Sequence, residues 1–226
     1  TLRDGAVLDG LWCSFNDCHM IELAQYTAEK AKLSRARIDE FSVRSQQKAG
    51  VAQAECRFSK EIVTVSIPQR KGDPLVVSKD ESVRADTTLE GLAKLGPVTK
   101  DKNGVITAGN APGLNDGGAA LVVMSAARVK ETGAKPIARV VAYATGGGEP
   151  KDLFFAPIDA VQRLMKKMGV QIGHFDLIEA NEAFAAQALA DGDALGWDWD
   201  RVNVNGGAVA LGHPIGASGA RVLTTL

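Results

Sequence analysis

The sequence has few cysteines, few aromatic residues and almost no net charge. Its three cysteines, Cys13, Cys18 and Cys56, form no CxxC pair, which argues against a disulfide framework or a cysteine zinc site. A net charge of −1 lacks the basic surplus that nucleic acid or an anionic membrane would require. No apolar run approaches the roughly 20 residues of a membrane span. These absences predict a small-molecule ligand and a cytoplasmic protein, with an organelle matrix as the other reducing compartment.

The composition that is present is typical of a globular protein. The 226 residues are 45% hydrophobic and 23% charged, enough to bury a core in one or two domains. The first residue is Thr1 rather than Met, and residues 222–226 have the pattern of the early part of a helix without a stop signal. We therefore expect the chain to be a piece of a longer protein.

Strand and helix patterns alternate in the second half of the chain, which predicts an α/β fold. Helices are predicted over residues 20–32, after Ser34, after a capping box at Thr87 and Glu90, from Ser125 to Gly133, from Pro157 to Gly169, and from Asn181. Strands are predicted over residues 61–67, 119–124, 137–143 and 175–180. The boundary between a helix-rich first half and this alternating second half lies near Pro112.

The glycine-rich segment 202–220, VNVNGGAVALGHPIGASGA, is the strongest candidate site. His213 lies between Gly212 and Pro214, and a histidine can act as a general base near neutral pH. The amides around Gly216 to Gly219 could bind an oxyanion or a phosphate. A tightly packed turn with an incidental histidine explains the spacing equally well. A dinucleotide fingerprint is not matched, because GxGxxG is absent.

Asn181 is a second candidate, because it follows a predicted strand where side chains of α/β proteins reach ligands. Capping of the next helix is the alternative role for an asparagine there. The three histidines, His19, His174 and His213, show no HxxxH or HxH spacing, so no protein-bound metal is predicted.

Two blocks, NEAFAAQAL at residues 181–189 and NVNGGAVALGHPIGASGA at 203–220, resemble the signature blocks of the thiolases. The family comprises acetyl-CoA acetyltransferases and 3-ketoacyl-CoA thiolases. RKGDP at 70–74, AGNAPGLNDG at 108–117 and the His19-Met20 pair support the resemblance in the same order. The related ketoacyl synthases fit less well, since their Gly-His-Thr is replaced by Gly-His-Pro.

The resemblance implies a layered αβαβα fold, represented by the loop domain and most of the C-terminal half. Residues 1–111 would form the loop domain that binds coenzyme A. Residues 112–135 would end the N-terminal half, and residues 136–226 would form a truncated C-terminal half. Homodimers or homotetramers are implied for the full-length protein.

The resemblance also implies roles for individual residues. His213 would activate the cysteine that accepts the acyl group, and Asn181 would orient a water in the oxyanion hole. Ala183 and Phe184 would line the acyl and pantetheine channel. Four residues match positions that contact coenzyme A: His19, Arg70, Ala111 and Leu114. The family's two catalytic cysteines match none of the three here, and we expect both outside this chain.

The predicted function is thiolytic cleavage or Claisen condensation of acyl-CoA substrates through a cysteine-bound intermediate, with no covalently bound cofactor. Pro112, Ile21 and DLFFAP at 152–157 depart from residues common in the family, which leaves the acyl chain length open. The alternatives are a non-catalytic acyl-CoA or lipid-binding protein of the same fold and an unrelated nucleotide-binding oxidoreductase. A fragment alone is predicted to be inactive.

Overall fold

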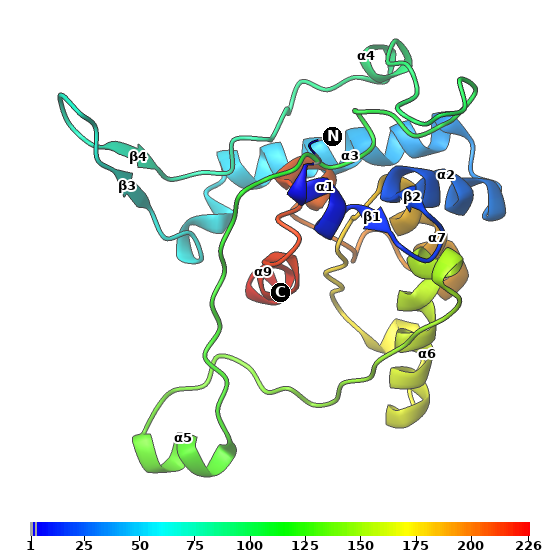
Figure 1. Ribbon diagram of the computed structural model, residues 1–226. Coiled ribbons are helices and arrows are strands. Elements are labelled where there is room, and N and C mark those ends of the chain that lie inside the picture. The colour runs from blue at the N-terminus through cyan, green and yellow to red at the C-terminus, as the bar shows by residue number, and fades with distance from the viewer. Residues whose placement is uncertain (1, 3) are drawn as a thin grey trace.

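The computed structural model describes residue 2 and residues 4–226, and helices dominate it (Figure 1). The α-helices are α1 Gly5–Gly10, α2 Met20–Lys30, α3 Arg35–Ala54, α4 Leu89–Ala93, α5 Ala126–Thr132, α6 Ala156–Met168, α7 Ala185–Leu195, α8 Ala208–Leu211 and α9 Ser218–Thr225. The strands are β1 Trp12–Cys13, β2 Cys18–His19, β3 Val65–Ile67 and β4 Leu75–Val77. Three 3-10 helices are η1 Arg57–Lys60, η2 Pro150–Phe155 and η3 Ile172–His174.

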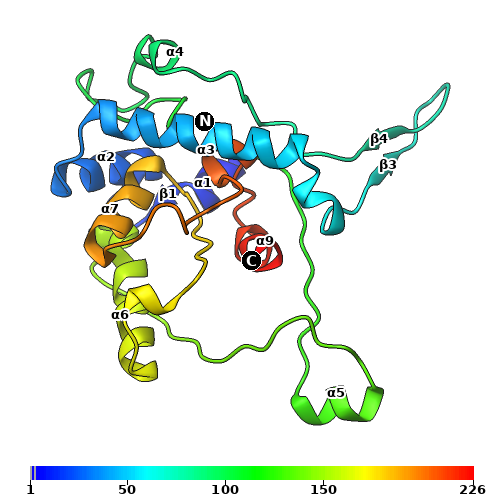
Figure 2. The ribbon, with the colours of Figure 1, turned by 180° about the vertical axis from the view of Figure 1, so that it is seen from behind.

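The long helix α3 forms one side of the core and packs against α7 and α8, and α2 packs against α7 (Figures 1 and 2). The Ser34 side chain accepts a hydrogen bond from Arg37 N, which confirms the predicted cap. Small side chains such as Ala24 of α2 and Ala186 of α7 are fully buried in the same apolar cluster as Ile38. Alanine at these positions lets the helix axes approach closely.

Local capping signals predicted several helix ends correctly, but not those at Thr87 and Asn181. α5 begins after Ser125 and stops at Gly133, and α6 stops at Gly169, as predicted; both glycines have positive φ. The predicted capping box is wrong by one residue. Thr88, not Thr87, accepts the hydrogen bond from Gly91 N, while Thr87 donates its hydroxyl to the Arg84 carbonyl.

Most predicted strands are extended but are not strands within the described residues. Segments 119–124 and 137–143 carry no ladder, and β3 covers only part of 61–67, where it pairs with β4. A strand requires a hydrogen-bonded neighbour, and no described segment lies in register with either of the first two. Their apolar side chains are accordingly exposed to solvent: Val122 is 87% exposed and Ile137 is fully exposed.

Segments 175–180 and 202–203 meet in a single parallel bridge between Ile178 and Val202. Ile178 N donates to the Arg201 carbonyl and Asn203 N to the Ile178 carbonyl, each at 2.9 Å. Parallel pairing brings the carboxyl ends of both segments to one edge. The two blocks that carry Asn181 and His213 therefore start side by side.

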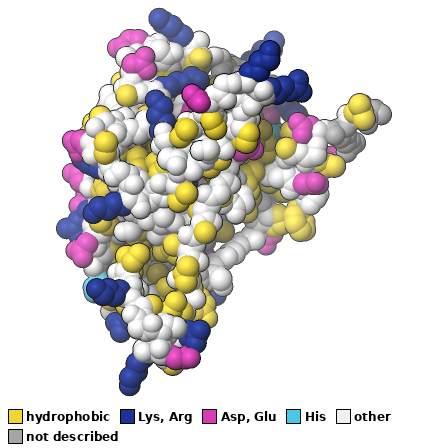
Figure 3. Space-filling model, turned by 90° about the vertical axis from the view of Figure 1, so that its left-hand side faces the viewer, with side chains coloured by type: hydrophobic (Ala, Val, Ile, Leu, Met, Phe, Trp, Pro, Cys, Tyr) yellow, Lys and Arg dark blue, Asp and Glu magenta, His cyan; other side chains and the backbone are white. Residues whose placement is uncertain are grey.

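Hydrophobic and basic side chains are distributed differently over the surface. Figure 3 shows hydrophobic side chains scattered across the middle of one face, with lysine and arginine mainly toward its edges. Helix α5 has no buried residue and sits at the end of a long extended arm (Figure 1). None of the helices formed by the described residues is long and apolar enough to cross a bilayer.

Candidate functional site

His213 lies just after the short helix α8, on a turn that only glycine accommodates readily. Gly212 has φ of +93°, and a Cβ added there would run into the Asn115 side-chain amide. That amide oxygen accepts a hydrogen bond from His213 N at 3.3 Å, across 98 residues of sequence. The glycine thus allows the AGNAPGLNDG block to hold the backbone of the histidine.

The His213 ring is half-buried and held by Ser218, the first residue of α9. His213 Nδ1 lies 2.6 Å from Ser218 Oγ, and Ser218 Oγ donates to the Pro214 carbonyl at 3.0 Å. A hydroxyl has one hydrogen, so when Ser218 donates to the Pro214 carbonyl it accepts from His213 Nδ1–H. This arrangement leaves the His213 Nε2 lone pair available. Burial lowers the pKa of the imidazole, which favours the neutral base.

An open groove of about 400 Å³ begins at Pro214, the residue after His213. Its walls are residues 115–119 on one side and residues 214–217 on the other. The walls touch closely at one point, where a Cβ on Gly117 would lie 2.7 Å from Pro214 Cγ. The structure therefore brings together two glycine-containing blocks that the sequence separates by about a hundred residues.

Asn181 does not cap the following helix, so that alternative is wrong. α7 begins at Ala185 rather than Asn181, and its N-cap residue, Phe184, makes no side-chain capping bond. Ala183 N instead donates to Gln187 Oε1 at 3.0 Å, and Ala185 N to the Asn110 carbonyl at 3.1 Å. These bonds hold residues 181–184 in a non-helical conformation, with Asn181 partly exposed.

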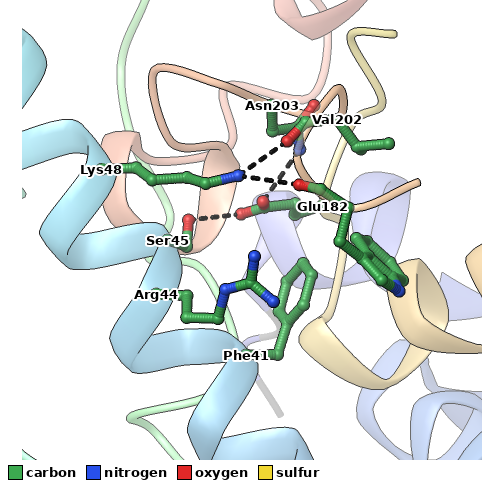
Figure 4. Close-up of a pocket in the computed structure, with 8 residues that line it drawn as sticks. Phe41, Arg44, Ser45, Lys48, Glu182, Val202 and Asn203 are labelled. Atoms are coloured by element: carbon green, nitrogen blue, oxygen red, sulfur yellow. Dashed lines mark hydrogen bonds between the residues drawn. The ribbon is translucent and has the colours of Figure 1, made fainter. Parts of the chain in front are cut away.

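Glu182, whose side chain is almost fully buried at 1% exposure, holds this segment in place. Figure 4 shows it between Ser45 and Asn203. Its carboxylate accepts hydrogen bonds from Ser45 Oγ at 2.8 Å, Asn203 Nδ2 at 2.8 Å and Val209 N at 3.0 Å. The last of these is in α8, which leads directly to His213. One buried carboxylate therefore connects α3, the Asn181 segment and the His213 segment. Burial raises the pKa of Glu182, against the effect of its three donors.

Lys48 of α3 completes the surroundings of Glu182 in a small cavity (Figure 4). Its ammonium donates to the Val202 carbonyl at 2.9 Å and the Trp199 carbonyl at 3.2 Å. Burial lowers the Lys48 pKa, and the neighbouring Arg44 lowers it further. The nearby Glu179 has its pKa raised to about 7, chiefly by burial. We interpret this cavity as a packing element under the site, because its polar groups bond to protein rather than into open space.

The residues predicted to contact coenzyme A lie in three different environments. His19 is the N-cap of α2: its Nδ1 accepts from Ile21 N at 3.1 Å, and the ring is partly buried. Neutral His19 therefore carries its proton on Nε2. Arg70 is exposed in the loop between β3 and β4, a hairpin that projects from the body in both ribbon views (Figures 1 and 2). It does not line the groove beside His213.

The apolar residues predicted to contact the substrate differ in how deeply they are buried. Ala111 and Ala183 are partly buried against the main apolar cluster. Phe184 is only 8% exposed and packs edge-on against Phe154, with ring centroids 5.4 Å apart. It is a core residue in this structure. Leu114 is 64% exposed, next to the start of the groove at Asn115.

Three residues of the site were not assigned a role from the sequence: Asn115, Ser218 as the partner of His213, and Glu182. Asn115 and Ser218 stand inside the blocks that were recognised, but their contacts with His213 depend on folding. Glu182 had a usable signal, since it is a charged residue within the apolar run EAFAAQALA. In the described part of the chain, no three His, Cys, Asp or Glu side chains gather as a metal would require.

Comparison with known proteins identifies the family. Residues 1–127 match the family model described as thiolase, N-terminal domain, and residues 134–226 match thiolase, C-terminal domain. The predicted divisions at residues 111 and 135 stay predictions. Acetyl-CoA acetyltransferases of Thiocystis violacea and Pseudomonas aeruginosa are 52% and 53% identical over 225 residues. All of this chain is covered, but it spans only 57% of the length of either relative.

Solved structures agree throughout the chain. The crystal structure of the Bacillus anthracis acetyl-CoA acetyltransferase superimposes with a TM-score of 0.93 at 41% identity, covering 100% of this chain and 58% of that one. Human mitochondrial 3-ketoacyl-CoA thiolase gives a TM-score of 0.90 at 35% identity, covering 100% and 56%. The extended, unpaired segments thus follow the backbone path of a thiolase, which confirms the predicted thiolase-like α/β fold. The chain belongs to the thiolase family.

Proposed function

We propose that this chain supplies the histidine side of the active site of a thiolase-type acyltransferase. The reaction is the thiolytic cleavage of 3-ketoacyl-CoA, or its reverse, the Claisen condensation of acyl-CoA. The acyl group is carried on a cysteine thioester. The family resemblance puts that cysteine outside these 226 residues, and Cys13, Cys18 and Cys56 have no part in the reaction.

The observation that supports this role is the hydrogen-bond order at His213. With the Ser218 hydroxyl donating to the Pro214 carbonyl, Ser218 accepts from Nδ1–H and Nε2 is the basic nitrogen. A thiolate, not a thiol, attacks a thioester carbonyl. His213 Nε2 takes the thiol proton as the cysteine sulfur bonds to the acyl carbon. It returns the proton to the coenzyme A sulfur when the original carbon–sulfur bond breaks.

Substrate access and binding of the thioester oxygen are the other requirements of the reaction. The open groove begins at Pro214, the residue after His213, and offers a flexible thioester a path toward the histidine. Asn181 orients a water toward the thioester oxygen, and Ala183 and Phe184 border the acyl channel. Phe184 does so from the core, where it supports the channel wall.

Coenzyme A and acyl-CoA are the proposed substrates, with no covalently bound cofactor. His19, Arg70, Ala111 and Leu114 are the proposed contacts, and Arg70 meets the phosphate-bearing end, to which a guanidinium is well suited. The relatives named above, bacterial acetyl-CoA acetyltransferases, support acetyl-CoA as the acyl donor. We also infer a cytoplasmic homodimer or homotetramer, which light scattering of the natural protein would test.

The experiment measures acylation of the protein in its full natural length. Purified protein is mixed with acetyl-CoA, and the covalent acetyl group is followed by intact mass. We expect His213→Ala to slow acylation about 10²- to 10⁴-fold, the usual contribution of a general base. His174→Ala is the matched control, because His174 is exposed and its ring meets Phe175 edge-on.

Two results would contradict the proposal. Normal acylation in His213→Ala would remove the role of the histidine. Coenzyme A binding without any acylation of the wild-type protein would instead favour the non-catalytic alternative.

A further inference from the structure

Two cysteines face each other across a small hairpin at the start of the chain. β1 and β2 lie together near the start of the chain (Figure 1). They are antiparallel, with Cys13 opposite Cys18 and Trp12 opposite His19. The turn between them is closed by a hydrogen bond from Trp12 Nε1 to Asp17 Oδ1 at 3.2 Å, and Asp17 has positive φ. Both thiols are free.

The register places the two α-carbons at a spacing that a disulfide can span. Met20 N donates to the Leu11 carbonyl at 2.8 Å, one of the ladder bonds that flank the Trp12–His19 pair, while Leu11 N donates to the Val7 carbonyl. Hydrogen-bonded and non-hydrogen-bonded pairs alternate along an antiparallel ladder, so Cys13 and Cys18 form a hydrogen-bonded pair. Its α-carbons lie about 5.5 Å apart. Disulfides join α-carbons about 4.4–6.8 Å apart, most often about 5.5–6 Å. Directly opposed residues also project to the same face.

The surroundings give the two thiols different reactivity. Asn16 Nδ2 donates a hydrogen bond to Cys13 Sγ at 3.1 Å. This bond lowers the pKa of the buried Cys13 by stabilising the thiolate, and it outweighs the opposite effect of burial. Burial raises the pKa of Cys18, and the neighbouring Cys13 raises it further. Cys13 therefore has the character of the attacking sulfur and Cys18 that of the resolving thiol.

We propose that Cys13 and Cys18 are a peroxide-sensitive pair that closes a reversible disulfide across the β1–β2 hairpin. The Cys13 thiolate attacks hydrogen peroxide, the O–O bond breaks, and a sulfenic acid forms with release of hydroxide. Cys18 sulfur then attacks Cys13 sulfur, and the S–O bond breaks. The oxygen leaves with the Cys18 proton as water. Two thiols are oxidised and one peroxide is reduced to two waters; a thiol reductant reverses the change.

The bond would close a six-residue ring immediately before His19, the N-cap of α2. Its formation does not depend on the acyl transfer proposed above, because neither cysteine takes part in that reaction. The two proposals can therefore fail separately.

The test compares the three thiols of the reduced chain after treatment with hydrogen peroxide. Remaining thiols are alkylated and the protein is digested with trypsin. Cys13 and Cys18 share one peptide, Asp4–Lys30, whereas Cys56 lies in Ala49–Arg57. We expect Asp4–Lys30 to lose the mass of two hydrogens and both alkylation sites while Cys56 is still alkylated. Dithiothreitol should restore both sites.

Variants distinguish a disulfide that the fold favours from nonspecific oxidation of thiols. Cys18→Ser should abolish the intramolecular bond and leave Cys13 as a sulfenic acid that dimedone captures, whereas Cys56→Ser should change nothing. Asn16→Leu should slow the loss of Cys13 and Cys18. The proposal is overturned if all three thiols are lost at the same rate, or if urea-unfolded chain closes the bond as fast as folded chain.

Discussion

The carboxylate of Glu182 offers the sharpest test of how the site is held together. It is buried and receives three hydrogen bonds, from Ser45, Asn203 and Val209. Glu182→Gln keeps the shape of the side chain and one acceptor oxygen, but sets an NH₂ group against one of these donors. Asn203 cannot turn its own amide to compensate, because Asn203 Oδ1 already accepts from Ala180 N at 2.8 Å.

The cost follows from the number of donors that lose their partner. Glu182→Gln leaves one buried donor unsatisfied and should lower the free energy of unfolding by about 2 kcal/mol. Glu182→Ala leaves three, and because leaving a buried donor unsatisfied costs about 1–3 kcal/mol, the loss should reach about 4 kcal/mol or more. Gly207→Ala should act on the same carboxylate, since the added Cβ would overlap it.

Urea unfolding followed by tryptophan fluorescence measures this effect directly, because Trp199 lines the same cavity. Glu131→Gln is a suitable control: Glu131 pairs with Arg128 on the exposed helix α5, and a surface pair should contribute within about 0.5 kcal/mol. A Glu182→Gln protein as stable as this control would refute the inference that Glu182 anchors the site.

Three further predictions test other parts of the structure. Burial raises the pKa of Asp191 from 3.8 to about 7, so between these pH values the folded state holds a proton that the unfolded state has lost. The free energy of unfolding therefore falls as the pH rises through this range. Urea unfolding of Asp191→Asn should lack this fall, and a variant with the same pH profile as the wild type would contradict the role of Asp191. Gly212→Ala should cost about 1–3 kcal/mol in thermal unfolding, because of the positive φ and the contact with Asn115, and an unchanged melting temperature would be inconsistent with this turn. ¹⁵N NMR of His213 should show the Nδ1–H tautomer, with Ser218→Ala shifting the population toward Nε2–H; an Nε2–H tautomer in the wild-type chain would contradict the assignment of the base.

The helices were predictable because their signals are local. Ser34, Ser125 and Gly169 act within one turn of the helix they cap or stop, and each does so in the structure. The strands were not, because a ladder depends on a neighbour far along the chain. The run at 119–124 has the apolar composition of a strand covered on both faces, yet Val123 is 77% exposed here. Composition reports what a segment can bury, not which segment will cover it.

The same distinction explains the site. The motif around His213 was recognisable, but the contacts that give the imidazole its chemistry were not. Asn115 lies 98 residues away along the chain. Ser218 is close in sequence, but only the fold places its hydroxyl 2.6 Å from His213 Nδ1 and 3.0 Å from the Pro214 carbonyl. The sequence allows Asn181 to be either a helix cap or a ligand contact, and the start of α7 four residues later excludes only the cap.

His213 is held from three independent directions, and this argues for a precise position rather than a loose one. Asn115 fixes its backbone nitrogen, Ser218 fixes one ring nitrogen, and Glu182 fixes α8, the helix that delivers the turn. Each contact comes from a different block of sequence. Since proton transfer depends on placing Nε2 within hydrogen-bond reach of the reacting thiol, loosening any one of them should reduce acylation without removing the histidine. Ser218→Ala should therefore lower the acylation rate less than His213→Ala does, and equal losses in the two variants would mean that the ring is not positioned in this graded way.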